Sequence, residues 1–264
     1  MGCILVKRAF GASVLGAAAL LSVIAVGPGG QRALAGSASR KADRIIRKHI
    51  KARGGMKTIK AIENVKVTGY VQAEGLEVDF TLWLQRPNRG RMEVTIRGLE
   101  IIQAYDGEVA WWINPLAGAS EPKEMPEVFA RSMRRWTEFD GPLVNYKKKR
   151  RRVEYVGQQG LREGGTAHEI KLTRADGEVW HVFVHTETYL EVMRTYEQTY
   201  QGDTTEVTTY FSDFTEVKGL KTPRVIEGLD VTGTPFKMVF ETIDTGVQID
   251  RAFFTMTGAL DAEE

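Results

Sequence analysis

Polar and apolar residues alternate with a period of two over most of the chain between residues 64 and 245. Successive side chains of a strand point to opposite faces of a sheet, so this alternation predicts half-buried β-strands. Asp106-Gly107 and Asp176-Gly177 predict two-residue hairpin turns inside two of the segments. Gln201-Gly202-Asp203 and Lys218-Gly219 are weaker turn signals. The alternating segments are 64–73, 77–86, 91–98, 100–114, 152–158, 167–185, 189–214, 222–228 and 236–245.

Two other segments have the spacing of amphipathic helices. The first, residues 39–55, has its apolar residues on one face. Ser39 can cap its start, and Gly54-Gly55 can end it. The second interrupts the strands and is ended by Gly141-Pro142. Its apolar face, at positions i, i+4 and i+7, consists of Phe129, Met133 and Trp136.

Short turns between about 10–11 strands predict antiparallel pairs in meander order, and a twisted sheet of that size must curl. We therefore expect a mainly β protein of the α+β class. Its core would be an incomplete antiparallel β-barrel closed by an N-terminal helix and a lid helix. Side chains just fill a barrel of about eight strands, so a larger one can enclose a cavity, although a solid core is the alternative. The side chains expected to face inward are Val78, Phe80, Leu82, Leu84, Met92, Val94, Ile96, Trp111, Trp180, Val182, Val184, Met238 and Phe240.

The first 35 residues have the pattern of a secretion signal. Lys7 and Arg8 precede an apolar run, and Ala33-Leu34-Ala35 matches a cleavage site. A retained membrane anchor is the alternative, because the run is about as long as a short spanning helix. We expect cleavage, which leaves a single exported domain of residues 36–264.

Removal of this segment changes the composition of the mature chain. Its single cysteine, Cys3, is lost, which excludes disulfides, thiolate metal sites and cysteine nucleophiles. Lys7, Arg8 and Arg32 are lost too, which leaves 33 basic against 34 acidic residues and a net charge of −1. The positive balance of the precursor thus belongs to the export segment and does not indicate nucleic-acid binding.

The sequence has none of the common motifs of catalytic or metal sites. HExxH, GxSxG, P-loop and GxGxxG motifs do not occur in the sequence. His181 and His185 are four residues apart, but on a strand they would be separated by roughly 13 Å, too far for one metal. His49 lies on the apolar face of the first helix, as a core histidine would. We expect that the protein binds no cofactor or metal and is not an enzyme. His168 is the one candidate catalytic residue if the chain does catalyse a reaction.

A run of six basic residues follows the second helix. The run is a solvated loop and strand edge in the simplest interpretation, since lysines also block edge pairing. An acidic membrane surface or an acidic partner is the alternative, and nucleic acid is disfavoured because few aromatic residues are interleaved. The run consists of Lys147, Lys148, Lys149, Arg150, Arg151 and Arg152.

The row formed by Phe80, Leu82 and Leu84 ends in Arg86, just before Pro87. A buried guanidinium costs several kcal/mol unless its donors are satisfied. Either Arg86 leaves the barrel at the strand end and reaches solvent, or it bonds to something inside.

Several short motifs occur in a recognisable order. They are Leu82-Trp83 before Arg86-Pro87-Asn88, then Asp106-Gly107, Trp112-Ile113-Asn114-Pro115, residues 139–146 (FDGPLVNY) and residues 247–254 (VQIDRAFF). In this order and spacing the chain, over residues 40–257, resembles the LolA/LolB superfamily of bacterial lipoprotein carriers. The closer resemblance is to its branch of outer-membrane lipoprotein-sorting proteins.

The resemblance implies a periplasmic carrier that takes lipoprotein acyl chains or another lipid into an apolar cavity and passes them towards the outer membrane. It would act as a monomer, between an inner-membrane donor and an outer-membrane acceptor. In the family the arginine of the R-P-N motif bonds the lid helix when the cavity is closed, so Arg86 would be a latch beside the lid residues Phe129, Met133 and Trp136. The alternative is an envelope-stress sensor or interaction protein that uses the same fold to detect lipoproteins. Greater length and the basic run depart from the well-studied carriers and leave the cargo open.

Overall fold

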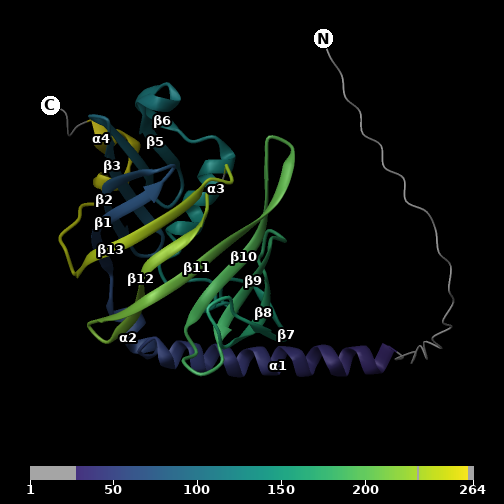
Figure 1. Cartoon of the computed structure of the whole chain (residues 1–264). Coiled ribbons are helices and arrows are strands. Elements are labelled where there is room, and N and C mark those ends of the chain that lie inside the picture. The colour runs from purple at the N-terminus through teal and green to yellow at the C-terminus, as the bar shows by residue number, and fades with distance from the viewer. Residues whose placement is uncertain (1–27, 231, 261–264) are drawn as a thin grey trace, which may run out of the picture.

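One antiparallel sheet of 13 strands dominates the computed structural model, which describes residues 28–230 and 232–260 (Figure 1). The first half of the sheet consists of β1 (Asn64–Ala73), β2 (Leu76–Gln85), β3 (Arg89–Ile96), β4 (Leu99–Tyr105), β5 (Ala110–Asn114) and β6 (Ala119–Glu124). The second half consists of β7 (Arg152–Gly160), β8 (Thr166–Thr173), β9 (Val179–His185), β10 (Glu191–Tyr200), β11 (Asp203–Val217), β12 (Leu220–Leu229) and β13 (Pro235–Thr245).

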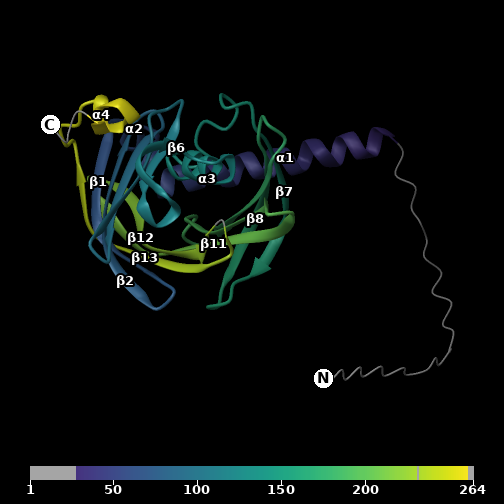
Figure 2. The same cartoon turned by 90° about the horizontal axis from the view of Figure 1, so that it is seen from above.

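Each half is a meander, and the pairing of β1 with β13 joins them, with Val65 opposite Thr245. Strands β6 and β7 are therefore the two edges, and the sheet does not close on itself. Seen from above, it curves around α3 (Glu127–Trp136), which lies between the two edges (Figure 2). The predicted mainly β, incomplete antiparallel barrel is confirmed.

The sheet has more strands than the 10–11 predicted. The additional strand β6 (sequence ASEPKE) shows no alternation, because charged residues and Pro122 interrupt it. Proline and charge are typical of edge strands, which have one unpaired side and must avoid pairing with other chains. Each turn predicted from an Xaa-Gly pair connects two neighbouring strands.

Helix α1 (Pro28–Ala52) runs along the foot of the barrel, beneath β7 to β9, and α2 (Gly55–Ala61) follows it (Figure 1). The start predicted at Ser39 is wrong: the helix continues back to Pro28, and proline is favoured at the first position of a helix. The predicted cleavage motif Ala33-Leu34-Ala35 lies in this first part of α1. The rest of the predicted export segment, residues 1–27, lies outside the described residues.

The turn between α1 and α2 is docked on the turn between β11 and β12. Gly54 has a φ of 111°, which favours glycine, and a Cβ there would collide with the carbonyl oxygen of Gly219. The Lys221 N–H donates to the carbonyl of Arg53 at 3.1 Å. These contacts hold the carboxyl end of α1 against the sheet.

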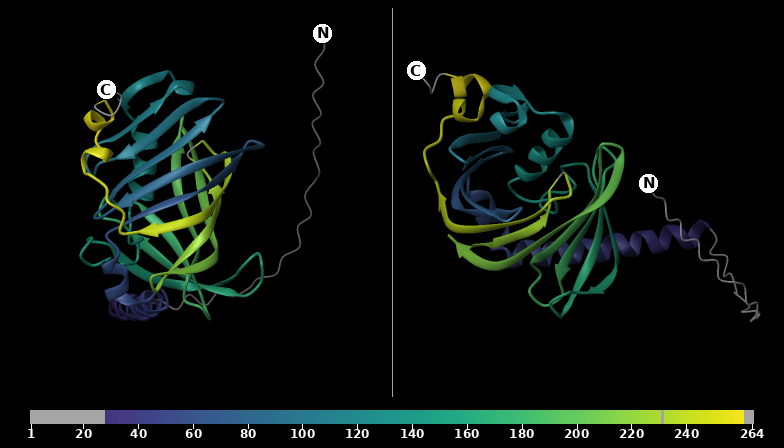
Figure 3. Two further views of the ribbon diagram at one scale, coloured as in Figure 1. Left: turned by 90° about the vertical axis from the view of Figure 1, so that its left-hand side faces the viewer. Right: turned by 45° about the horizontal axis from the view of Figure 1, so that its top comes forward.

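After β13 the chain returns to the outer face of β2 to β6 as η2 (Ala252–Phe254) and α4 (Met256–Leu260) (Figure 3). The rings of Phe253 and Trp83 lie 5.0 Å apart, and Trp111 Nε1 donates to the carbonyl of Phe254 at 2.8 Å. The convex face of the first half is thus covered around Trp83 and Trp111. Within residues 28–230 and 232–260, no helix is both long and apolar enough to cross a membrane.

Candidate functional site

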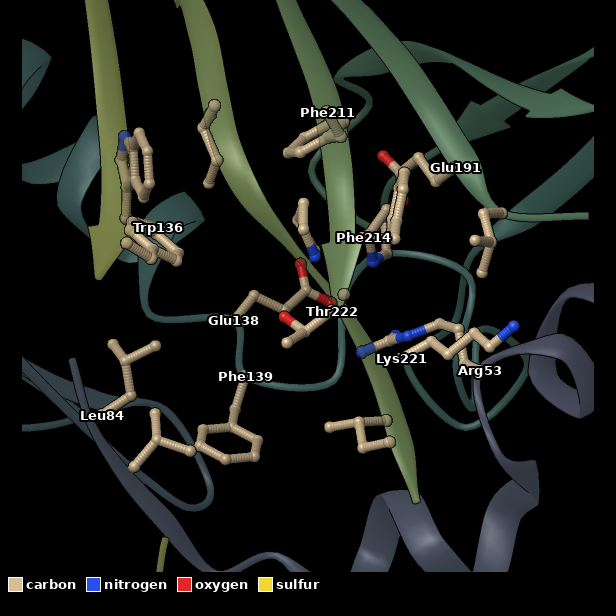
Figure 4. Close-up of a pocket in the computed structure, with 18 of the residues that line it drawn as sticks. Arg53, Leu84, Trp136, Glu138, Phe139, Glu191, Phe211, Phe214, Lys221 and Thr222 are labelled. Carbon is tan, nitrogen blue, oxygen red and sulfur yellow. The ribbon is translucent and has the colours of Figure 1, made fainter. Parts of the chain in front are cut away.

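The concave face of the sheet encloses a cavity of about 250 Å³ (Figure 4). Its walls come from the inner faces of the central strands, the carboxyl end of α1 and the loop of residues 137–142 that follows α3. Leu82, Leu84 and Phe240 are among its apolar wall residues, together with Phe211 and Ile226. Strand alternation explains this wall, because every second residue of a strand faces the concave side.

Two aromatic side chains partly fill the cavity from the side of α3. Trp136, the last residue of α3, is 36% exposed, and its ring lies 6.1 Å from that of Phe236. Phe139 enters from the loop after α3 and packs on the apolar cluster that includes Leu82 and Phe240. Both rings line the cavity, as the close-up shows (Figure 4).

Arg86 lies behind this loop and not in the cavity itself. Its guanidinium donates to the carbonyl of Ile62 at 2.7 Å and to that of Ile59, at the carboxyl end of α2. It also forms an ion pair with Asp140 at 2.6 Å and stacks 4.7 Å from the ring centre of Phe139. Arg86 thus bonds to α2, to Ile62 just after it, and to the loop after α3. The expected bonds from Arg86 to the lid helix itself are not among these contacts.

Glu138 is held by three cations where the loop meets β7. Its carboxylate accepts from Lys149 at 2.7 Å, from Arg151 at 2.6 and 2.9 Å, and from Arg174 at 3.2 Å. Burial alone would raise its pKa, but the Arg151 hydrogen bonds and the Lys149 charge outweigh it and lower the pKa to about 2. Glu138 is therefore an anion that anchors the loop.

The basic run of residues 147–152 is divided by this arrangement. Lys149 and Arg151 turn inward to Glu138, which removes them from the predicted membrane or partner contact. Lys147, which pairs with Asp43 at 3.3 Å, is exposed. Lys148, Arg150 and Arg152 are exposed too. The sequence pattern could not tell the inward-facing basic residues from the exposed ones, because the run contains no apolar residue to show which positions face the core.

A second polar layer lies between α3 and β9 to β11. Arg135 donates to Gln198 at 2.8 Å, pairs with Glu178 and lies 4.1 Å over the ring of Tyr196. Arg194 is bound by Glu191 at 2.6 Å.

His49 lies beside this layer, and its Nδ1 donates to the carbonyl of Tyr189 at 2.9 Å. Burial, followed by the charges of Arg53 and Arg194, lowers the pKa of His49 to about 3. The imidazole is therefore neutral at physiological pH.

Four of the predicted cavity residues line the cavity: Leu82, Leu84, Trp180 and Phe240. Phe80, Met92, Val94 and Met238 belong to the apolar cluster that continues its wall, and Val182 and Val184 to the cluster under α1. Val78 and Ile96 are half-buried near the far ends of their strands, away from the cavity.

Trp111 faces the opposite side of the sheet from the one predicted. It is fully buried on the convex face with Ile102 and Ala104, under the C-terminal segment, and Trp112 is the inward residue. The segment AWWIN is apolar at both parities, so periodicity could not assign its faces; the cover over the convex side decided them.

The predicted lid residues separate into two places. Phe129 and Met133 pack with Tyr105 and Trp112 in an apolar cluster under α3, outside the cavity, whereas Trp136 lines it. The helix ends at Trp136 and not at Gly141-Pro142, so the loop residue Phe139 takes a place that the helical pattern gave to α3.

His168, the residue singled out for catalysis, lies outside the cavity between the rings of Tyr155 and Tyr189. Burial, followed by Lys41 and Lys48, lowers its pKa. Among the described residues, no group of three or more His, Cys, Asp or Glu side chains is placed to hold a metal ion.

The polar residues of the cavity were missed by the sequence analysis. Arg53, Arg135, Glu138, Glu191 and Arg194 stand in turns, in a helix end or on strands whose partners are remote in sequence. Only the clustering of charge around FDGPLVNY, one of the motifs of the resemblance, could have drawn attention to Glu138.

Comparison with solved structures identifies the architecture. A LolA superfamily protein from Nitrosomonas europaea matches with a TM-score of 0.53 at 12% identity, over 81% of this chain and 97% of that one. The fold is LolA-like. A DUF1329 family protein from Desulfovibrio piger (TM-score 0.56, 11% identity, 82% of this chain and 98% of that one) has the same LolA-like architecture. So does a domain described as a putative outer membrane lipoprotein-sorting protein from Vibrio parahaemolyticus (0.56, 10%, 83% and 98%). No protein-family model and no curated protein matches the chain.

Proposed function

We propose that the protein is a periplasmic carrier that binds a lipidic cargo in its apolar cavity and passes it on without covalent chemistry. The observation that carries this is the cavity itself, apolar along the strands and partly filled by Trp136 and Phe139. The LolA-like fold, which the similar structures share, supports the same role. An inner-membrane donor, an outer-membrane acceptor and a monomeric state are parts of the proposal.

The cavity has to widen before it can take a long acyl chain. Pockets that bury a drug-sized ligand measure about 300–1,000 Å³, so 250 Å³ is too small for a long acyl chain. Trp136 and Phe139 are the side chains whose displacement would enlarge it. The loop that carries Phe139 is held by the Arg86–Asp140 pair, so loading requires this pair to loosen.

The energetics explain why such a filled cavity suits a carrier. Each buried methylene contributes about 0.8 kcal/mol, so a sixteen-carbon chain gains roughly 12 kcal/mol before any cost. Cargo held with all of that energy would not be released. Re-exposing an aromatic ring costs about 1.5–3 kcal/mol, so displacement of Trp136 and Phe139 lowers the net affinity and their return assists release.

The test is to purify the exported protein, extract it with organic solvent and identify lipids by mass spectrometry. Competition against N-phenyl-1-naphthylamine, a neutral probe that fluoresces in apolar surroundings, would follow on delipidated protein. Enriched acyl species, or probe displaced by amphiphiles, is the expected result. A folded protein with no extracted lipid and no probe binding would refute the carrier and leave an interaction protein.

A further inference from the structure

The charged groups of the cavity leave one half-buried cation, Arg53, without a carboxylate within ion-pair distance. The charged lining residues are Arg53, Arg135, Glu138, Glu191, Arg194 and Lys221. Glu138 is paired with Lys149, Arg151 and Arg174, Glu191 with Arg194, and Arg135 with Glu178. Every carboxylate in the wall is therefore already neutralised by a cation of its own.

Arg53 has a different environment. One Nη donates to the main-chain carbonyl of Asp140 at 2.6 Å, and the carboxylate of Asp140 itself is bound by Arg86. Among the described residues, no carboxylate oxygen lies within ion-pair distance of Arg53, and its other N–H groups have no acceptor. Burial lowers the pKa of its guanidinium, but an arginine stays protonated at physiological pH.

A second cation stands next to it. Lys221 donates its backbone N–H to the carbonyl of Arg53, and both residues line the cavity (Figure 4). The exposed side chain of Lys221 forms no ion pair within the described part of the chain. His49 on α1 is neutral. The carboxylates that act on Arg53 from a longer distance are Glu191 and Asp140, and each of them is already paired with another arginine.

We infer that this end of the cavity binds the anionic head of an amphiphile, a carboxylate or a phosphate, at Arg53 and Lys221, while the tail lies along the apolar strands. A planar guanidinium with free donors suits both oxyanions, because two N–H groups can meet two oxygens. This inference rests on the proposed function and narrows the cargo to anionic amphiphiles.

The test compares ligands that share one tail. Displacement of N-phenyl-1-naphthylamine from the purified protein would be measured for dodecanoate, dodecyl phosphate and dodecanol. A charged hydrogen bond contributes about 1.5–3 kcal/mol, which predicts that at least one anionic ligand binds about tenfold or more tightly than dodecanol. Whichever of the two anions binds more tightly identifies the head group as carboxylate or phosphate.

Variants of Arg53 locate the effect. Arg53→Met should bring the ratio of anion to alcohol affinity close to one, and Arg53→Lys should retain part of the preference. Arg47→Met, which removes an exposed cation from the same helix, should leave the ratio as in the parent protein. Thermal unfolding of each variant controls for folding.

The outcomes separate the two proposals. Equal affinity of the parent protein for dodecanol and both anions overturns the anionic head group while leaving the carrier intact, and this result needs no variant to fold. A preference that survives in folded Arg53→Met overturns the assignment to Arg53. Failure of the neutral probe and of all three ligands to bind refutes the carrier, and the inference with it.

Discussion

The ion pair between Arg86 and Asp140 should restrain opening of the cavity, and Asp140→Asn is the change that tests it. The substitution removes the carboxylate charge but keeps the main-chain carbonyl that Arg53 binds. Arg86 keeps its bonds to the carbonyls of Ile59 and Ile62. The loop after α3 is thus loosened at one point, and the anchor on α2 remains.

The magnitude follows from how buried the pair is. The side chains of Arg86 and Asp140 are 17% and 14% exposed. Breaking a fully buried pair costs about 3–5 kcal/mol and an exposed one about 0–1 kcal/mol. A value of about 1–2 kcal/mol lies between these limits. If the pair exists only in the closed state, the same free energy is removed from the cost of opening, which raises cargo affinity by a factor of about 5–30.

Two measurements on the same samples check this reasoning. Urea unfolding at neutral pH should show the loss of stability, and titration with N-phenyl-1-naphthylamine should show tighter binding. Asp79→Asn, which removes an exposed carboxylate from β2, is the matched control and should change neither quantity. A destabilised Asp140→Asn protein that binds the probe no more tightly than the parent would show that the pair does not restrain opening.

Three further predictions concern the stability of the site and its surroundings. The pKa of Glu138 is lowered to about 2, so its stabilising contribution is fully present above its unfolded pKa and is lost as pH falls through the folded one. Glu138→Gln should therefore lower the free energy of unfolding by about 3 kcal/mol at pH 7. Urea titrations from pH 7 to 2.5 should show the difference in stability between variant and parent shrinking below pH 4.5. His49 gives a loss in the same direction over a higher pH range. Its pKa is lowered to about 3 in the folded state, so the free energy of unfolding should fall by about 1.4 kcal/mol per pH unit between pH 6 and 4, and His49→Asn should lose this slope. Trp111→Phe should destabilise the protein by about 1–3 kcal/mol, since the carbonyl of Phe254 loses its donor. It should leave probe affinity unchanged; a changed affinity would show that Trp111 contacts the cavity.

The sequence by itself determined the class of fold. Period-two alternation specified strands such as β2 and β13, because a half-buried strand must place every second side chain on the core. The Asp-Gly and Lys-Gly pairs located turns, because few residues other than glycine adopt positive φ easily. The inward rows that include Leu82 and Phe240 followed from the same local rules.

Only the tertiary structure decided which face of β5 is inside, since Ala110 to Ile113 is apolar throughout and the cover by Phe253 and Phe254 lies far along the chain. It also decided the partners of Arg86. A guanidinium is satisfied by whichever oxygens the fold brings near, and here these belong to α2 and to Asp140.

The charges around Arg53 depend on the fold in the same way. The charged residues near Arg53 come from a helix end, a loop and two strands that are separated along the chain. Local pattern governs backbone conformation and burial, which repeat over a few residues. Pairing of charges depends on distances across the folded barrel, which no local pattern contains.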